Sequence, residues 1–166
     1  RAVQELSPVC ARELCARAAE LSGLRKGWDL ERRILDAARA SFAATVEQAG
    51  HRYRRGETEF FWEGEPGVCR RFRRPGPGEA RDAFEVAFPE LEALASQTVP
   101  GPGEEPVRLM GAALGLARMG LAVGDRLKSA WDSAGRAGGP PAGKGGPYPE
   151  GDGPPRAEVD PGGTAG

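Results

Sequence analysis

The chain has 166 residues, of which 39% are hydrophobic and 28% are charged, and its formal net charge at pH 7 is −1. This composition excludes a membrane-spanning chain and a wholly disordered one, and the near-neutral charge excludes a nucleic-acid binder that relies on its overall charge. With 25 glycines and 15 prolines, part of the chain is predicted to lie outside any packed core.

The first complete helix is predicted to begin at Ser7 as N-cap, with Pro8 in the first helical position, and to end at Gly23. Its apolar residues recur at helical spacing, at Leu14, Ala18 and Leu21. Residues 1–6 are interpreted as the end of an earlier helix whose beginning is missing, so we expect the chain to be a C-terminal fragment.

A second, longer helix is predicted from Asp29, its expected cap, to Gly50. The apolar stripe of this helix consists of Leu30, Ile34, Leu35, Ala38, Phe42 and Val46. Residues 51–54 and 58–62 then form two β-prone segments around a glycine turn, which predicts a hairpin. Alternation puts Phe60 and Trp62 on one face, where we expect them to pack on the long helix; the environment of Phe61 stays open.

Two helices followed by a hairpin is the element order of a winged helix, a variant of the helix-turn-helix. We therefore predict a winged-helix unit over residues 1–62, with its first helix truncated, and an Arg-, Pro- and Gly-rich linker over residues 63–82. Beyond the linker, helices are predicted from Pro89 to Ala95, from Pro106 to Leu114 and from Leu121 to Ala134.

A short repeat links the two halves of the chain. The turns Gly23–Gly27 and Gly115–Gly120 each lie between two predicted helices, and Ile34 and Leu127 each follow seven residues later, at an offset of 127 − 34 = 93. Residues 83–134 are therefore predicted to be a second, degenerate helix-turn-helix unit without a wing. Residues 135–166 contain 11 glycines and 7 prolines and are predicted to be a disordered tail, so the fold class is mainly α (α+β).

Motifs for catalysis and for metal binding are not found in the sequence. It has no phosphate-binding loop, and its single histidine, His51, is assigned no role. The cysteines are Cys10, Cys15 and Cys69, an odd number without a C-x-x-C pair; we expect free thiols, with Cys10 and Cys15 buried. We predict no catalytic residue, metal or cofactor, and no enzyme activity in this chain.

Basic residues near the predicted turn and wing are the remaining chemical signal. Guanidinium groups suit phosphate because their planar fork donates two hydrogen bonds to it. The predicted nucleic-acid-binding residues are Arg25, Lys26, Arg32, Arg33, Arg52, Arg54 and Arg55. Four more arginines, Arg70, Arg71, Arg73 and Arg74, surround Phe72 in the linker and either extend this basic face or pair with nearby acids.

Over about residues 3–134, the chain resembles the C-terminal domain of very large bacterial superfamily I DNA helicase-like proteins. The motifs that carry the resemblance are Leu6-Ser7-Pro8-Val9, Glu13-Leu14, Leu24-Arg25-Lys26-Gly27, Ile34, Arg54-Arg55-Gly56-Glu57-Thr58-Glu59-Phe60-Phe61-Trp62, Phe88-Pro89-Glu90-Leu91-Glu92 and Leu109-Met110-Gly111 to Arg126-Leu127-Lys128. In that family an ATPase motor, often with a nuclease-like domain, lies upstream. The resemblance implies an accessory DNA-binding module that works beside those domains. We also predict a cytoplasmic location.

The predicted function is a grip on duplex DNA, made mainly through phosphate contacts, while the upstream helicase or nuclease domains act. The alternative is a protein-interaction or domain-docking module without nucleic-acid contact, because a winged helix can pack on a neighbouring domain through the same helix.

Overall fold

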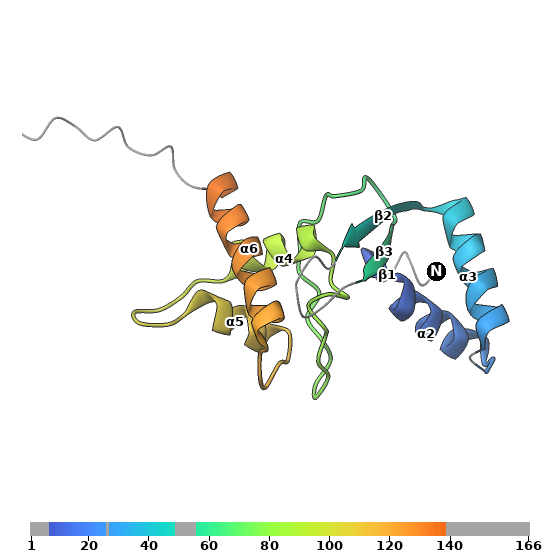
Figure 1. Cartoon of the computed structure of the whole chain (residues 1–166), viewed down its shortest axis with the longest axis horizontal. Coiled ribbons are helices and arrows are strands. Elements are labelled where there is room, and N and C mark those ends of the chain that lie inside the picture. Colours follow the sequence, from blue (N-terminus) through green and yellow to red (C-terminus); the bar gives the residue numbers. More distant parts are fainter. Residues whose placement is uncertain (1–6, 26, 49–55, 139–166) are drawn as a thin grey trace, which may run out of the picture.

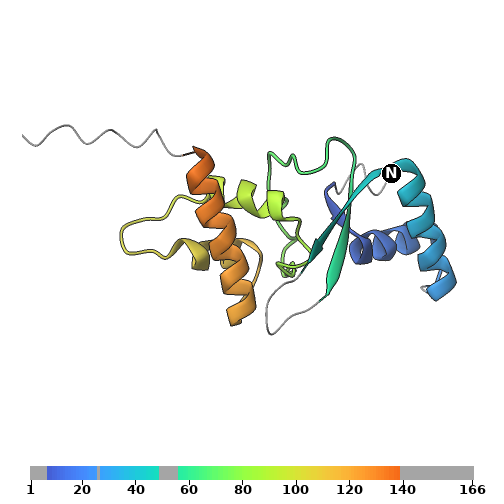
Figure 2. The same ribbon diagram turned by 45° about the horizontal axis from the view of Figure 1, so that its top comes forward.

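The structure, a computed structural model, describes residues 7–25, 27–48 and 56–138. These residues contain five helices and a three-stranded antiparallel sheet. The elements are β1 (Val9–Cys10), α2 (Ala11–Ser22), α3 (Trp28–Ser41), β2 (Ala43–Gln48), β3 (Glu57–Trp62), α4 (Phe88–Gln97), α5 (Pro106–Ala113) and α6 (Leu121–Gly138). The sheet lies between the helix pair α2 and α3 and the helix group α4, α5 and α6 (Figures 1 and 2). The fold is therefore α+β, as the sequence predicts at this level.

Strand β3 is the centre of the sheet, whose order is β1-β3-β2 with both pairings antiparallel. Its aromatic side chains alternate between two cores. Phe61 packs with Leu14 and Ala38 of the helix pair, whereas Phe60 and Trp62 pack on the other side with Ala87. Phe60 and Trp62 are buried as predicted, but the prediction that they face the long helix is wrong, since Phe61 occupies that position.

Helix α2 begins later than the sequence predicts. Cys10 is its N-cap, and the Cys10 thiol accepts a hydrogen bond from the backbone N–H of Glu13. Ser7 is not the cap; its hydroxyl accepts from the N–H of Glu63. The prediction fails here because Val9 and Cys10 pair with Phe61 and Phe60 of β3, and this pairing holds the backbone before α2 in an extended form.

Helix α3 is shorter than predicted at its C-terminal end and begins one residue before the expected cap Asp29, with Gly27 as its N-cap. It ends at Ser41, and residues predicted to continue the helix to Gly50 form β2 instead. Phe42, the C-cap, already has an extended backbone. Strand β2 pairs with β3 from Ala43↔Trp62 to Gln48↔Glu57, and this pairing overrides the helical spacing of Phe42 and Val46.

The predicted hairpin exists, but its first strand is β2, which precedes residues 51–54. The segment 51–54 lies outside the described residues, as do residues 1–6, where the end of an earlier helix is predicted.

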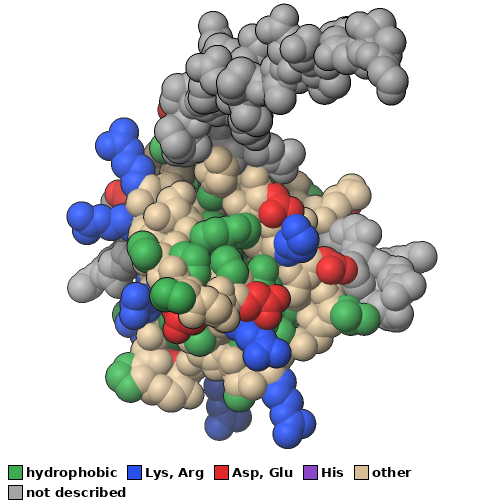
Figure 3. Space-filling model, turned by 90° about the vertical axis from the view of Figure 1, so that its left-hand side faces the viewer, with side chains coloured by type: hydrophobic (Ala, Val, Ile, Leu, Met, Phe, Trp, Pro, Cys, Tyr) green, Lys and Arg blue, Asp and Glu red, His purple; other side chains and the backbone are tan. Residues whose placement is uncertain are grey.

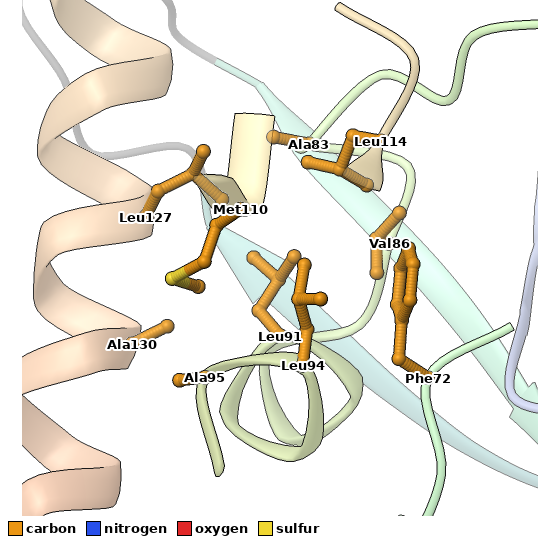
Figure 4. Close-up of a cluster of buried hydrophobic side chains, with 10 residues drawn as sticks. All are labelled: Phe72, Ala83, Val86, Leu91, Leu94, Ala95, Met110, Leu114, Leu127 and Ala130. Atoms are coloured by element: carbon orange, nitrogen blue, oxygen red, sulfur yellow. The ribbon is translucent and has the colours of Figure 1, made fainter. Parts of the chain in front are cut away.

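The helices α4, α5 and α6 surround the largest core of the described chain (Figure 4). Its side chains come from α4 (Leu91, Leu94, Ala95), α5 (Met110), α6 (Leu127, Ala130), and the segments around them (Phe72, Ala83, Val86, Leu114). The three predicted helices are confirmed here, with prolines in their first turns at Pro89 and Pro106. Helix α6 continues to Gly138, so the start of the predicted disordered tail, residues 135–138, is helical.

Charged side chains connect the two helical groups. Arg126 of α6 donates to the carboxylate of Glu47 on β2 at 2.6 Å, and the backbone N–H of Phe88 donates to the same carboxylate at 2.7 Å. Arg73, from the segment predicted to be a linker, donates to Glu13 of α2 at 2.8 Å. The segment 63–82 therefore contributes Phe72 to the core and Arg73 to the contact between the groups. The division of the chain at residues 62 and 83 stays a prediction.

Candidate nucleic-acid interface

The turn from α2 to α3 and the first half of α3 carry the predicted DNA-binding residues that the structure describes. These are Arg25, Arg32 and Arg33, and all three are exposed. The other predicted residues, Lys26, Arg52, Arg54 and Arg55, lie outside the described residues.

The turn is built by glycines at both of its ends. Gly23 caps α2 in the left-handed conformation, with φ = 65°, and its N–H bonds back to the carbonyls of Ala19 and Glu20. A side chain larger than hydrogen is strained in this conformation, which explains the glycine. Gly27 then precedes α3 and places no side-chain acceptor over its first turn. The turn thus brings Arg25 to the N-terminal end of α3.

Arg32 is held in place by two neighbours from the same helix. Its Nη2 atom lies 3.1 Å from Oδ1 of Asp29, and its guanidinium carbon lies 5.0 Å from the centre of the Trp28 ring. Both partners of the ion pair are largely exposed, so the pair adds little stability and phosphate can compete for the guanidinium.

Arg25 and Arg33 form no ion pair with another residue in the described part of the chain. On α3, Arg33 lies about 100° around the helix axis from Arg32, so these two side chains leave the helix in different directions. The only fully buried residue of α3 is Ala38, and the outer side of the helix lies at one end of the molecule, with no other described element beyond it (Figure 1).

Arg39, further along α3, is engaged by carboxylates. Its Nε and Nη2 atoms donate to the two carboxylate oxygens of Glu59 on β3, at 2.9 Å and 2.7 Å. Nη1 faces Asp36 at 3.5 Å. The Glu59 carboxylate raises the pKa of Arg39 above its ordinary value through this paired hydrogen bond. Arg39 is therefore a link between α3 and the sheet, and it contributes no free cation to the surface.

The arginines after β3 separate into two kinds. Arg70, Arg71 and Arg74 are exposed, and none forms an ion pair within the described residues. Arg70 and Arg71 line a hollow of about 480 Å³ beside Trp62. Arg73 instead points inward to Glu13, and its backbone N–H donates to the buried carboxylate of Glu90 at 3.0 Å. Pairing with an acid thus applies to Arg73, and the extension of the basic face by Arg70, Arg71 and Arg74 stays a prediction.

Sequence reasoning missed the exposed apolar side chains at the same turn. Leu21, Leu24 and Trp28 are each at least half exposed, and Trp28 is the most exposed of the three, at 74%. Helical spacing gives no signal for this feature, because Leu21 belongs to the apolar positions of its helix. The surface at the turn is therefore both cationic and apolar.

The opposite end of the molecule has a different surface. The face that α5 and α6 present in Figure 3 shows a central group of hydrophobic side chains with acidic and basic side chains interspersed around it. Such a mixture creates no extended cationic field for a polyanion. The start of α3 also carries exposed acids, Asp29 and Glu31, beside Arg32 and Arg33.

The thiols and acids of the described residues form no group that could hold a metal ion. Burial raises the pKa of the Cys10 thiol to about 11, so it is protonated at neutral pH. Burial also raises the pKa of Cys69. Residues 7–25, 27–48 and 56–138 contain no cluster of three or more His, Cys, Asp and Glu side chains that could hold a metal ion. Among the described helices, none has the length and apolarity needed to cross a membrane.

No protein-family model, no curated protein and no solved structure matches the chain. A functional assignment must therefore be argued from the geometry and chemistry of the residues themselves.

Proposed function

We propose that residues 1–62 form a winged helix that binds duplex DNA mainly through its phosphates. The observation that carries the proposal is the exposed turn and outer side of α3, where Arg25 and Arg33 have no carboxylate partner among the described residues and Arg32 has an exposed one. In a helix-turn-helix, the second helix and the turn before it are the parts that approach DNA.

The sheet supports the same proposal. Helices α2 and α3 are inserted between β1 and β2, and the antiparallel pair of β2 and β3 follows them as the wing would. Arg52, Arg54 and Arg55 belong to the segment that joins these strands, so in a winged helix they would sit on the wing. The resemblance to helicase-associated domains is consistent with a module that grips DNA for upstream domains.

The test is the salt dependence of binding to a fluorescently labelled 20-base-pair duplex, measured by anisotropy between 50 and 200 mM salt. The logarithm of the binding constant should fall with the logarithm of salt concentration, with a slope of about −0.9 per phosphate contacted. The variant Arg25→Ala, Arg33→Ala should weaken binding to all sequences and reduce this slope by about two.

A matched control exists in the second helical group. Arg118 lies 118 − 25 = 93 residues after Arg25, at the same place in the repeated turn, and is also exposed. Arg118→Ala should leave the affinity and the slope unchanged. The proposal fails if the wild-type chain does not bind the duplex, or if the Arg25, Arg33 variant binds with the same slope.

A second candidate function is protein docking, which the exposed side chains of Leu21, Leu24 and Trp28 favour. Apolar docking depends weakly on salt, whereas phosphate binding depends on it steeply. A partner protein that binds with equal affinity at 50 and 200 mM salt, and loses affinity in Leu24→Ala, would support this second function.

A further inference from the structure

Trp28 is the first residue of α3 and places most of its indole ring in solvent. Its exposed fraction is 74%, whereas Trp62 is 3% exposed and Trp131 packs partly against the core of the second helical group. This large aromatic ring is not buried in any core of the described residues and is accessible to a partner. Its position at the basic turn suggests that it contacts a ligand.

The ring has one occupied side and open surroundings. The Arg32 guanidinium lies over it at 5.0 Å from the ring centre, and Asp29 holds that guanidinium in place. The preceding residue is Gly27, and a Cβ added there would meet no atom within 4 Å. The indole is therefore supported by a cation and free to accept a flat partner.

We infer that Trp28 stacks on an exposed nucleobase of the DNA that the arginines hold, an inference that rests on the proposed function. Every base has a π-face on which an aromatic side chain can stack, without sequence preference. Bases inside a duplex have both faces covered by their neighbours. The ligand is consequently DNA with an uncovered base, at a blunt end or in a single-stranded overhang.

Charge complementarity favours this ligand over a protein. The Arg32 guanidinium lies over the ring, and Arg25 and Arg33, at the same turn and on the same helix, are exposed and form no ion pair within the described residues. A nucleotide offers the two matching features together, a flat ring and a phosphate. The indole has no acceptor and a single N–H donor, so Trp28 is poorly suited to read the edges of bases in a groove.

The experiment measures how well each of three unlabelled DNAs displaces a labelled overhang duplex from the protein. The three competitors are compared at equal base-pair concentration. The competitors are a relaxed closed circle, a blunt linear duplex and an overhang duplex. The full chain should bind the overhang duplex, the blunt duplex or both about tenfold more tightly than the circle, the usual effect of one stacked base. Preference for the overhang alone identifies an unpaired base, and equal preference for both linear DNAs identifies the terminal base pair.

The variant Trp28→Ala should abolish this preference while it still binds the closed circle, and Trp28→Phe should retain part of the preference. Leu121→Ala is the matched control, because Leu121 is 66% exposed, begins α6, and lies 121 − 28 = 93 residues after Trp28. This control should keep the full preference.

Indole fluorescence gives an independent readout of the same contact. Stacking should quench the emission of Trp28 on addition of overhang duplex, and the quenching should be absent in Trp28→Ala.

The outcomes separate the two proposals. If the chain binds all three DNAs equally, or if Trp28→Ala keeps the preference, the stacking inference is wrong and the phosphate grip stands. If no DNA binds at either salt concentration, the phosphate grip itself is wrong and stacking falls with it. Salt-independent capture of a protein partner that requires Trp28, together with unchanged DNA binding in Trp28→Ala, would likewise overturn the inference.

Discussion

Replacement of Glu90 should destabilise the protein more than replacement of any exposed acid, because the Glu90 carboxylate is buried and joins three segments. Its side chain is 1% exposed. The carboxylate accepts two hydrogen bonds from Arg81, at 2.6 and 3.0 Å, and one from the backbone N–H of Arg73, at 3.0 Å. In Glu90→Ala these three donors lose their acceptor, and the Arg81 guanidinium, 11% exposed, stays buried as an uncompensated charge.

Breaking a buried ion pair from one side typically costs about 3–5 kcal/mol. With a urea m-value of about 2 kcal/mol per molar, the unfolding midpoint should fall by about 2 M. Glu90→Gln keeps the shape and one acceptor oxygen, so its midpoint should lie between those of Glu90→Ala and the wild type. The assay is equilibrium urea unfolding followed by circular dichroism.

The control is Glu105→Ala, which removes an exposed Arg–Glu ion pair at the surface. Glu105 pairs with Arg108 at 3.1 Å, with side chains that are 63% and 80% exposed. Its loss should change the unfolding free energy by less than about 1 kcal/mol. If the two alanine variants shift the midpoint equally, the buried carboxylate does not stabilise the contact between the segments, and the reasoning is refuted.

Four further changes are each measured by urea unfolding: three substitutions and a rise in pH. Gly115→Ala should destabilise the protein by more than about 1 kcal/mol, because φ is 77° there and the new methyl group would overlap the carbonyl oxygen of Glu79. Gly124→Ala should stabilise the protein by about 0.5–1 kcal/mol, because Gly124 lies inside α6 with open space around it. Arg126→Met should cost about 3 kcal/mol by removing the buried partner of the β2 carboxylate, and a change below 1 kcal/mol would contradict this role. Because burial raises the pKa of Cys10 from 9.0 to about 11, stability should be unaffected below pH 9 and fall by up to about 3 kcal/mol as pH rises to 11; Cys10→Ala should remove that part of the decline.

Local signals predicted the second helical group well. Pro89 and Pro106 lie in the first turns of α4 and α5, where proline suits a helix start, and the glycine and proline residues between helices end them. These signals act within a few residues and depend little on the rest of the fold. The predicted helices in this part of the chain therefore agree with the structure to within a few residues.

Tertiary pairing decided the elements that the sequence predicted wrongly. Phe42 and Val46 are four residues apart, a spacing that fits one face of a helix. The same four residues are twice the two-residue period of a strand, so the spacing also fits one face of a strand. Hydrogen bonding of β2 to β3 selects the extended form. Strand β1 has only two residues and is defined by its pairing with β3, so no local sequence pattern predicts it.

The sequence predicted which residue types form the candidate site, but it only partly predicted which of their side chains are exposed and unpaired. Arg25, Arg32 and Arg33 were identified by charge and by position at the turn. Whether an arginine is free depends on distant carboxylates: Arg126 meets Glu47, 79 residues away in the sequence. Single-sequence patterns carry no information on such partners.

These carboxylates divide the arginines by function. Arg73 and Arg126 donate to acids of α2 and β2 and so connect the helical groups, and Arg81 donates to Glu90 of α4; all three side chains are at most about one third exposed. A guanidinium committed in this way cannot bind phosphate without breaking the fold. In the first helical group, Arg12 and Arg17 form exposed ion pairs with Glu85 and Glu20, whereas Arg25 and Arg33 form no ion pair within the described residues. Substitutions at Arg25 and Arg33 remove cations that the fold does not use, so they discriminate between phosphate binding and apolar docking without breaking an ion pair of the described residues.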